Sequence, residues 1–299
     1  MAVVSANGIS VAYDEVGDKA KPAIVLIMGL GMQLLAWPDA FCQGLADRGF
    51  RVIRFDNRDT GLSTKVEGGP PIDLGNALLS ALTGKPVKAP YTLRDMAGDA
   101  LGLLDALDIA RAHMIGASMG GMIAQIIAAE HADRTRSLVS IMSSSGNRSL
   151  PQGKQEVVAA LLAPRPSIGD REAAIQHSMK IARAISSPGY PPVDADLRAR
   201  IERSFDRSYY PVGVARHFMA VLASGDRVEL LKRVRVPTLV VHGADDPLVP
   251  VEAGKETAAL VPGAKLTIVP GMGHDLPAGL FPILTDSIAQ HCKAVDAST

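Results

Sequence analysis

Short apolar runs recur along the chain and are separated by segments whose apolar residues follow a helical spacing. Runs of this kind predict β-strands at residues 23–28, 51–56, 113–115, 138–142, 238–242 and 265–269. The intervening segments predict helices at residues 39–48, 92–107, 122–129 and 280–291. Strands that alternate with helices favour an α/β fold with a mostly parallel central sheet covered by helices on both faces. In such sheets ligands gather at the carboxyl ends of the strands.

The start of the chain and two internal segments depart from this alternation. Two strand-like segments flank Asn7-Gly8, a dipeptide suited to a type I′ turn, so a β-hairpin is expected there. Residues 64–90 form a Gly- and Pro-rich excursion in which residues 74–82 can form a short apolar helix. Residues 147–225 contain amphipathic segments with Pro and Gly breaks and no strand-like run. We therefore expect a core domain of residues 1–146 and 226–299, and a helical cap (lid) domain of residues 147–225.

Composition and charge disfavour several classes of protein. The 299 residues suit one large α/β domain with an insertion, and 47% hydrophobic and 21% charged residues are ordinary globular usage. Lys plus Arg equals Asp plus Glu at 31 each, so neither nucleic acid nor an anionic membrane is an expected partner. The sequence shows no signal peptide and no run of membrane-spanning length, which predicts a soluble cytoplasmic protein. The pattern carries no signal for an oligomeric state.

The two cysteines give no candidate site. Cys42 and Cys292 are far apart and have no C-x-x-C or His-rich neighbourhood. Neither a disulfide framework nor a metal site is expected, and no cofactor is expected. Cys42 is interpreted as a small packed residue, because no strand-turn motif surrounds it that would favour a nucleophile.

One short stretch of the sequence is a candidate catalytic motif. Gly116-Ala117-Ser118-Met119-Gly120 lies between a predicted strand and a predicted helix, which is the order of a nucleophile elbow. A serine at such a turn projects its hydroxyl clear of the sheet, and the glycines let neighbouring backbone pack closely. The alternative interpretation is an ordinary helix start with Ser118 as its N-cap. The strand-turn-helix context favours Ser118 as a nucleophile.

A serine nucleophile needs an imidazole base, and the base needs a carboxylate to orient it. His274 follows the strand at 265–269 in a glycine-rich loop that can aim its ring at the sheet edge. The loop after the strand at 238–242 offers Asp245 and Asp246, and both qualify by chain position. Asp275 is weaker, because adjacent residues tend to point apart. Packing or surface roles are assigned to the other histidines: His113, His131, His177, His217, His242 and His291.

An oxyanion site requires two backbone N–H groups aimed at the developing negative charge. Met119 follows the nucleophile at the start of its helix, where the helix dipole adds to the effect. The second donor is expected from Leu30, in the loop after the strand at 23–28. Gly29 and Gly31 leave this loop open enough for close approach to a substrate, although a plain glycine turn has the same pattern.

With these motifs, the sequence resembles the α/β-hydrolase fold superfamily over nearly its whole length. The motifs are Gly116-Ala117-Ser118-Met119-Gly120-Gly121, Gly243-Ala244-Asp245-Asp246-Pro247 and Gly271-Met272-Gly273-His274. The resemblance implies an α/β-hydrolase fold with Asp246 rather than Asp245 as the acid. Met28 stands where many relatives have a histidine, so other contacts must hold the oxyanion loop.

A second group of residues narrows the resemblance. The loop at residues 56–63 is similar to the superfamily's D-x-R-G-x-G-x-S loop, with Asp59 in place of the usual glycine. Together with Met28-Gly29 and Trp37-Pro38, this variant is similar to aclacinomycin methylesterase-like enzymes, which cleave methyl esters of polyketide antibiotics. The excursion at residues 64–90 is longer than this loop usually is, so the substrate entrance is expected to differ.

The expected function is a serine carboxylic-ester hydrolase (carboxylesterase) that forms an acyl-enzyme on a small to medium, largely apolar ester. Alternatives with the same three residues are a cofactor-free perhydrolase (haloperoxidase-like), a lactonase and a C–C hydrolase. A non-catalytic ligand receptor is the alternative of another class. A carboxylate on the substrate would meet Arg58 or Arg216. The residues expected to contact substrate are Gly29, Trp37, Met179, Tyr209 and Phe218.

Overall fold

The computed structural model describes residues 1–70, 72–167 and 169–298. In these residues, eight strands form one sheet in the order β1-β2-β4-β3-β5-β6-β7-β8. The strands are Ala2–Ala6 (β1), Ile9–Val16 (β2), Ala23–Ile27 (β3), Arg51–Phe55 (β4), Ala112–Ala117 (β5), Thr135–Ile141 (β6), Thr238–Gly243 (β7) and Lys265–Val269 (β8). Each strand expected from the apolar runs is therefore present.

The sheet is antiparallel at its first edge and parallel elsewhere. β1 and β2 form the predicted hairpin, in which Asn7 and Gly8 have φ angles of 51° and 76°. β2 also pairs antiparallel with β4. The pairings of β4 with β3, β3 with β5, and onward to β8 are all parallel. The mostly parallel sheet is thus confirmed, and its strand ends after β3 to β8 share one edge.

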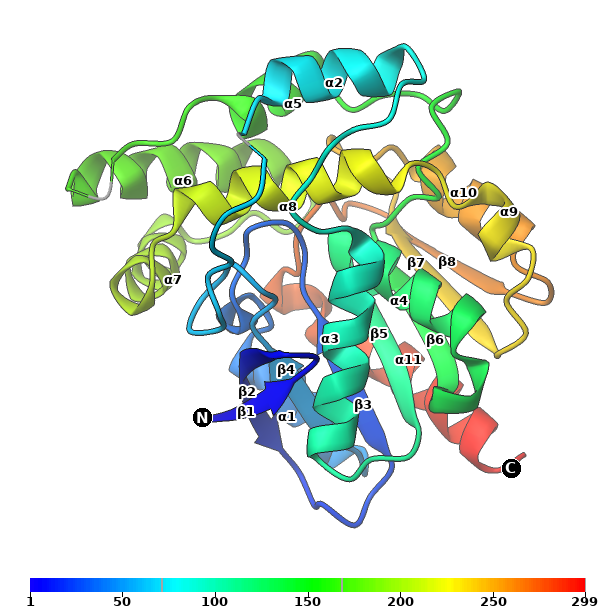
Figure 1. Cartoon of the computed structure of the whole chain (residues 1–299). Helices are drawn as coiled ribbons and strands as arrows, with labels where there is room; N and C mark the ends of the chain where they lie inside the picture. The colour runs from blue at the N-terminus through cyan, green and yellow to red at the C-terminus, as the bar shows by residue number, and fades with distance from the viewer. Residues whose placement is uncertain (71, 168, 299) are drawn as a thin grey trace.

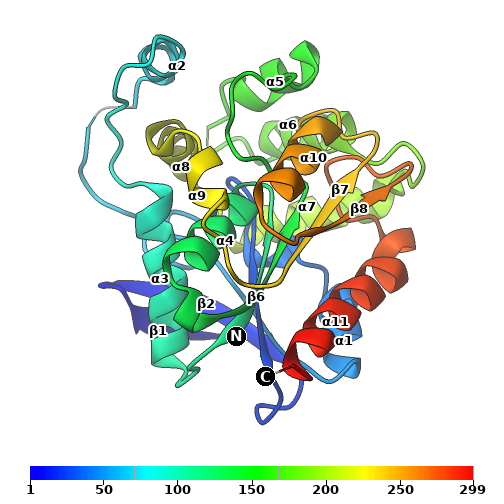
Figure 2. The same ribbon diagram turned by 90° about the vertical axis from the view of Figure 1, so that its right-hand side faces the viewer.

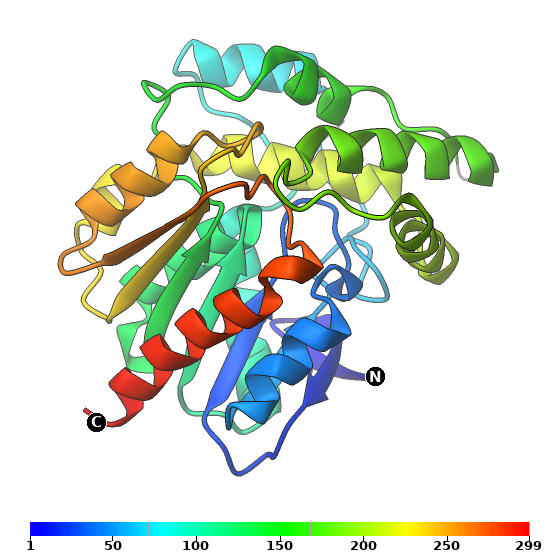
Figure 3. The ribbon, with the colours of Figure 1, turned by 180° about the vertical axis from the view of Figure 1, so that it is seen from behind.

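Helices cover both faces of the sheet and create two apolar cores (Figure 2). α3 (Leu93–Ala106) and α4 (Met119–Glu130) cover one face, while α1 (Asp39–Asp47) and α11 (Phe281–Asp296) cover the other. Figure 3 shows α1 and α11 side by side. Every residue of β3 is buried, because its alternate side chains enter the two cores.

Local sequence features explain why α3 was predicted and why another helix, α10, was not. Thr92 caps α3, and the Thr92 side chain and Asp95 form a full capping box, as their spacing predicts. α10 (Val251–Leu260) was not among the expected helices, because Gly254 interrupts its pattern of helix formers. An added Cβ at Gly254 would lie 2.5 Å from the His242 ring, so the glycine permits close packing of α10 on β7.

Between β6 and β7 the described residues form helices only. These are α5 (Gln155–Leu162), α6 (Arg171–Ile185), α7 (Asp194–Arg207), α8 (Pro211–Ser224) and α9 (Val228–Leu231). Figure 1 shows α5, α6 and α8 across one end of the sheet, and α2 (Leu74–Leu82) packs along α8. The division into a core domain and a cap domain stays a prediction. Across the described ranges, no helix is long and apolar enough to cross a membrane.

Candidate active site

Ser118 lies in a tight turn between β5 and α4. Its φ and ψ angles are 55° and −122°, a conformation that side-chain-bearing residues rarely adopt. An added Cβ at Gly116 would lie 2.1 Å from the Gly120 carbonyl oxygen, and one at Gly120 would lie 2.0 Å from the Ile27 carbonyl oxygen. Only glycine fits at either position, so the two glycines allow the strained turn that directs Ser118 into a pocket.

The side chains of Ser118, His274 and Asp246 form one chain of hydrogen bonds. His274 Nδ1 lies 2.7 Å from Asp246 Oδ2, and His274 Nε2 lies 3.0 Å from Ser118 Oγ. A carboxylate only accepts, so the imidazole proton is at Nδ1 and Nε2 accepts from the serine hydroxyl. The three residues follow β5, β7 and β8, and they meet at the shared edge of the sheet.

The structure separates the two neighbouring carboxylates that the sequence left open. Asp246 Oδ1 accepts from the backbone N–H groups of Leu248 and Val249 at 2.9 and 2.8 Å, which leaves Oδ2 for His274. Asp245 instead accepts from the Gly271 N–H at 2.9 Å. Asp246 therefore orients the histidine, and Asp245 joins the loops after β7 and β8.

Backbone and side-chain contacts from the α6–α7 connection fix the loop that carries His274. The His274 N–H donates to the Ile185 carbonyl at 2.8 Å. Asp275 accepts from the backbone N–H and the hydroxyl of Ser187. Burial raises the pKa of Asp275, and its bonds to Ser187 oppose this. Asp275 is thus an anchor of the loop and makes no hydrogen bond to the imidazole.

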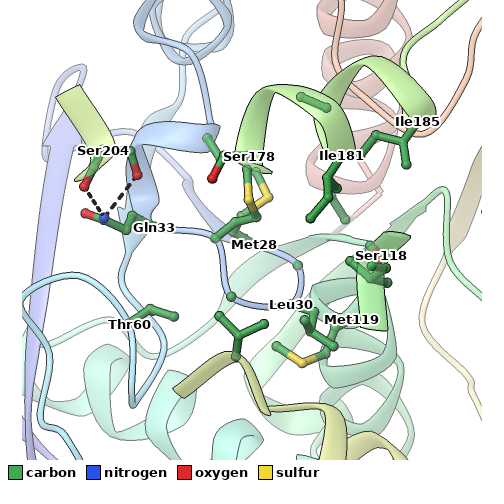
Figure 4. Close-up of a pocket in the computed structure, with 18 of the residues that line it drawn as sticks. Met28, Leu30, Gln33, Thr60, Ser118, Met119, Ser178, Ile181, Ile185 and Ser204 are labelled. Carbon is green, nitrogen blue, oxygen red and sulfur yellow. Dashed lines mark hydrogen bonds between the residues drawn. The ribbon is translucent and has the colours of Figure 1, made fainter. Parts of the chain in front are cut away.

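Leu30 and Met119 line the pocket beside Ser118 (Figure 4). Neither of their backbone N–H groups donates a hydrogen bond to another residue in the part of the chain that the structure describes. The Met119 N–H belongs to the first turn of α4, where the helix dipole favours negative charge. An added Cβ at Gly29 would lie 3.1 Å from Ser118 Cβ, so the loop after β3 passes close to the serine.

His217 of α8 holds the loop after β3, a role that was not predicted. Its Nδ1 accepts from the Gly31 N–H at 3.1 Å, and its Nε2 donates to the Arg58 carbonyl at 2.7 Å. Burial lowers the pKa of His217 to about 4, which keeps the ring neutral. Asn57 also donates to the Met28 carbonyl at 2.9 Å. The sequence signalled only that Met28 replaces the usual histidine and that other contacts were needed.

The pocket encloses about 430 Å³, within the usual range for small-molecule sites. Gly29, Tyr209 and Phe218 line it, and their contact with a substrate stays a prediction. Most of the other lining side chains are apolar and come from the loop after β3 and from helices α6 to α8. Figure 4 shows Ser178 and Ile181 of α6 across the cavity from Leu30 and Met119.

Two residues that were expected to contact substrate lie outside the pocket lining. Trp37 is fully buried and stacks on Phe41, with 5.5 Å between the ring centroids, in the core beneath α1. Met179 packs on Ile175 and Leu197 between α6 and α7. Successive helical residues point about 100° apart, so Met179 turns away although its neighbour Ser178 lines the pocket.

The two arginines suggested as carboxylate partners are already engaged. Arg58 forms two 2.6 Å hydrogen bonds to Asp99, and Arg216 lies 3.3 Å from Asp59. Asp59 also accepts from the Tyr91 hydroxyl at 2.7 Å. Its φ angle of 64° is one that aspartate tolerates better than most residues, which explains how it replaces a glycine. The expectation that Arg58 or Arg216 meets a substrate carboxylate is therefore wrong.

Among the described residues, Cys42, Cys292 and His242 form no second site. Burial raises the pKa of the Cys42 and Cys292 thiols to about 11 and 12, so both stay protonated at neutral pH. The Nε2 of His242 bonds to the Val249 carbonyl at 2.8 Å. Within residues 1–70, 72–167 and 169–298, no group of three or more His, Cys, Asp or Glu side chains could hold a metal ion.

Comparisons with known proteins match this architecture. The family model described as alpha/beta hydrolase fold matches residues 22–277. Rhodomycin D methylesterase DauP of Streptomyces sp. (strain C5) is 26% identical over 98% of each chain. The enol-lactonase of Burkholderia xenovorans LB400 has a TM-score of 0.75 at 24% identity, with 98% of this chain and 100% of that chain covered. The meta-cleavage product hydrolase CumD of Pseudomonas fluorescens IP01 has a TM-score of 0.77 at 19% identity over 98% of each.

Proposed function

Because the chain belongs to the α/β-hydrolase fold family, we propose that it is a serine carboxylic-ester hydrolase that works through an acyl-enzyme. The observation that carries this proposal is the chain of hydrogen bonds from Ser118 through His274 to Asp246. It has the geometry that nucleophile, base and orienting acid require. The similarity to a methylesterase supports ester cleavage over the other reactions that such a triad performs.

In the first step, the Ser118 Oγ atom attacks the ester carbonyl carbon and His274 Nε2 takes the hydroxyl proton. The imidazolium then gives this proton to the departing alcohol, which leaves an acyl group on Ser118. A water molecule repeats the sequence, with His274 again as base, and releases the acid. Asp246 keeps the Nδ1 proton in place and stabilises the imidazolium through the 2.7 Å hydrogen bond.

The Leu30 and Met119 N–H groups are proposed to bind the oxyanion that forms on the carbonyl oxygen. Both residues flank Ser118 in the pocket, and neither N–H has another acceptor among the described residues. Donors that are already in place need no reorganisation when the charge develops, so they stabilise the transition state more than the substrate. No cofactor is required by this scheme.

Residues 147–225 are proposed to act as the cap that shapes the substrate site. Tyr209 of the α7–α8 connection and Phe218 of α8 line the pocket, as does Gly29 of the loop after β3. A cavity of about 430 Å³ suits a small to medium ester with a largely apolar body. The cytoplasmic location stays a prediction from the sequence.

The test is the variant Ser118→Ala, measured on a panel of esters that vary separately in their acyl and alcohol parts. We expect kcat to fall by a factor on the order of 10⁴ or more, with the unfolding curve retained. Ser298→Ala, at the exposed end of the chain, is the matched control and should behave as the wild type. A serine-directed phosphonate should label the wild type and not Ser118→Ala. Full ester turnover by Ser118→Ala, or no turnover and no labelling in the wild type, would contradict the proposal; the latter result would favour a ligand receptor.

A further inference from the structure

Two arginines in the pocket wall make no hydrogen bond or ion pair with a described residue, and of these Arg200 is exposed whereas Arg165 is half-buried. Arg165 lies in the connection between α5 and α6 and lines the pocket that contains Ser118. It is half-buried, and its guanidinium makes no hydrogen bond or ion pair with any residue that the structure describes. Most other arginines of the chain that face the interior, such as Arg58, are paired with carboxylates.

The carboxylates that line the same pocket are used elsewhere. Asp59 is bound by Arg216 and by the Tyr91 hydroxyl. Asp275 is bound by Ser187 and faces the exposed Arg200, whose charge lowers the Asp275 pKa. Neither acid is therefore available to neutralise Arg165.

Arg165 is partly withdrawn from solvent. Burial lowers the pKa of Arg165, which reflects the cost of a charge removed from solvent. His177 lies close enough that the charge of Arg165 lowers its pKa, after the larger effect of burial. The His177 Nε2 atom is itself buried and has no hydrogen-bond partner in the structure. A half-buried cation without a counter-ion is stabilised when an anion binds.

The backbone holds Arg165 in place before any ligand arrives. Pro164 and Pro166 flank it, and a proline restricts the residue before it to an extended conformation. The Pro166 carbonyl accepts from the Tyr209 hydroxyl at 2.8 Å, and the Tyr209 ring packs on Phe205 with 4.8 Å between centroids. This arrangement lowers the conformational entropy that binding would cost.

We propose that Arg165 binds a carboxylate carried by the ester substrate, so that the enzyme acts on esters with a second, free carboxylate group. This inference rests on the proposed function and specifies its substrate class. The planar guanidinium fork matches the two oxygens of a carboxylate. Leu161, Ile181 and Ala182 line the same wall, so an apolar chain joins the ester to this carboxylate.

The experiment compares pairs of esters that differ only in the terminal group. One series consists of p-nitrophenyl monoesters of straight-chain dicarboxylic acids of increasing length, and the other of acetate esters of ω-hydroxy acids. Each member is paired with its terminal carboxamide. The measured quantity is the ratio of kcat/KM for the carboxylate to kcat/KM for the amide, in wild type, Arg165→Gln, Arg165→Lys and Arg233→Gln. Arg233 is exposed and lies outside the pocket, so its variant controls for the loss of one positive charge.

We expect the wild type to prefer the carboxylate in at least one series, with an optimum chain length. Arg165→Gln should lower the ratio by about 10- to 100-fold, the effect of a lost charge-assisted hydrogen bond. Arg165→Lys should lie between, and Arg233→Gln should match the wild type. If Arg165→Gln does not fold, a carboxylate preference that survives high ionic strength in the wild type and is weakened in Arg165→Lys still supports the inference.

Two results would overturn it: no carboxylate preference at any chain length, or a preference that Arg165→Gln leaves unchanged. These failures differ from failure of the proposed function. If Ser118→Ala hydrolyses the amide-terminated esters as fast as the wild type, the ester hydrolase proposal itself is wrong. If turnover depends on Ser118 but the ratio does not depend on Arg165, only the carboxylate site is wrong.

Discussion

The Nδ1 atom of His217 accepts a hydrogen bond from the Gly31 backbone N–H at 3.1 Å, across 186 positions of the chain. The opposite nitrogen donates to the Arg58 carbonyl, so the tautomer is fixed. The contact joins α8 to the loop that carries Leu30. Met28 stands in this loop where many relatives have a histidine. Here His217 binds the backbone N–H of Gly31, the residue after Leu30, whose own N–H is the proposed oxyanion donor.

We predict that His217→Gln lowers kcat by about 10- to 100-fold with little change in KM, because a shifted oxyanion donor weakens only the transition state. Glutamine can keep the donor to Arg58 but presents no acceptor near the Nδ1 position. His217→Asn places an oxygen near that position and should recover part of the loss. Rates are to be divided by the number of sites that a phosphonate titrates. Both variants could contain fewer active sites that react with the phosphonate and still have the wild-type kcat per reactive site. In that case His217 has only a structural role.

We predict that His217 lowers the free energy of unfolding of the protein in mild acid. The folded-state pKa of about 4 lies below the reference value of about 6.5 for an unfolded histidine. As pH falls from about 6.5 to about 4, the unfolded chain gains a proton that the folded chain does not, so the free energy of unfolding decreases. The decrease from this group is about 1.4 kcal/mol per pH unit and about 3 kcal/mol in all. The hydrogen bond to the Arg58 carbonyl and the charge of Asp59 oppose this lowering of the His217 pKa, while the charges of Arg58 and Lys65 add to it.

Urea unfolding at several pH values, compared between wild type and His217→Asn, measures this contribution. The variant should lose less stability between neutral pH and pH of about 4. His113, whose pKa burial also lowers to about 4, remains in both proteins and gives both a residual slope. Identical slopes in the two proteins would show that His217 does not titrate in this way.

Asp246→Asn should lower kcat by a factor on the order of 10³ to 10⁴. The carbonyl of the new amide would accept from the Leu248 and Val249 N–H groups, so its NH₂ would face His274. The imidazole would then carry its proton on Nε2 and could not accept the serine proton. Asp245→Asn is the matched control, because an amide oxygen still accepts from the Gly271 N–H. Equal losses in the two variants would argue against Asp246 as the orienting acid.

Local chemistry determined much of the fold. The run at residues 23–28 is apolar at every position, which predicts a strand with both faces buried beneath other elements. β3 is such a strand. Asn7-Gly8 predicted the hairpin, and Thr92 with Asp95 predicted the start of α3. Each of these features depends on residues only a few positions apart, so it can be predicted directly from the sequence.

The meeting of Ser118, His274 and one aspartate also followed from the sequence, since the carboxyl ends of parallel strands share one edge. Chain position alone did not choose between Asp245 and Asp246; Pro247, which restricts Asp246 to an extended backbone, and the family resemblance favoured Asp246. The structure separates them by the direction of each side chain.

The sequence by itself thus determined the α/β architecture, the turn that holds Ser118 and the histidine that faces it, because each depends on short-range patterns. Only the tertiary structure decided which side chains line the pocket. It placed Trp37 and Met179 in packed interiors, engaged Arg58 and Arg216 with acids, and left Arg165 open to the pocket. It also brought His217 to Gly31. Such contacts join segments that are far apart in the chain. Composition and periodicity do not predict which of these distant side chains come into contact.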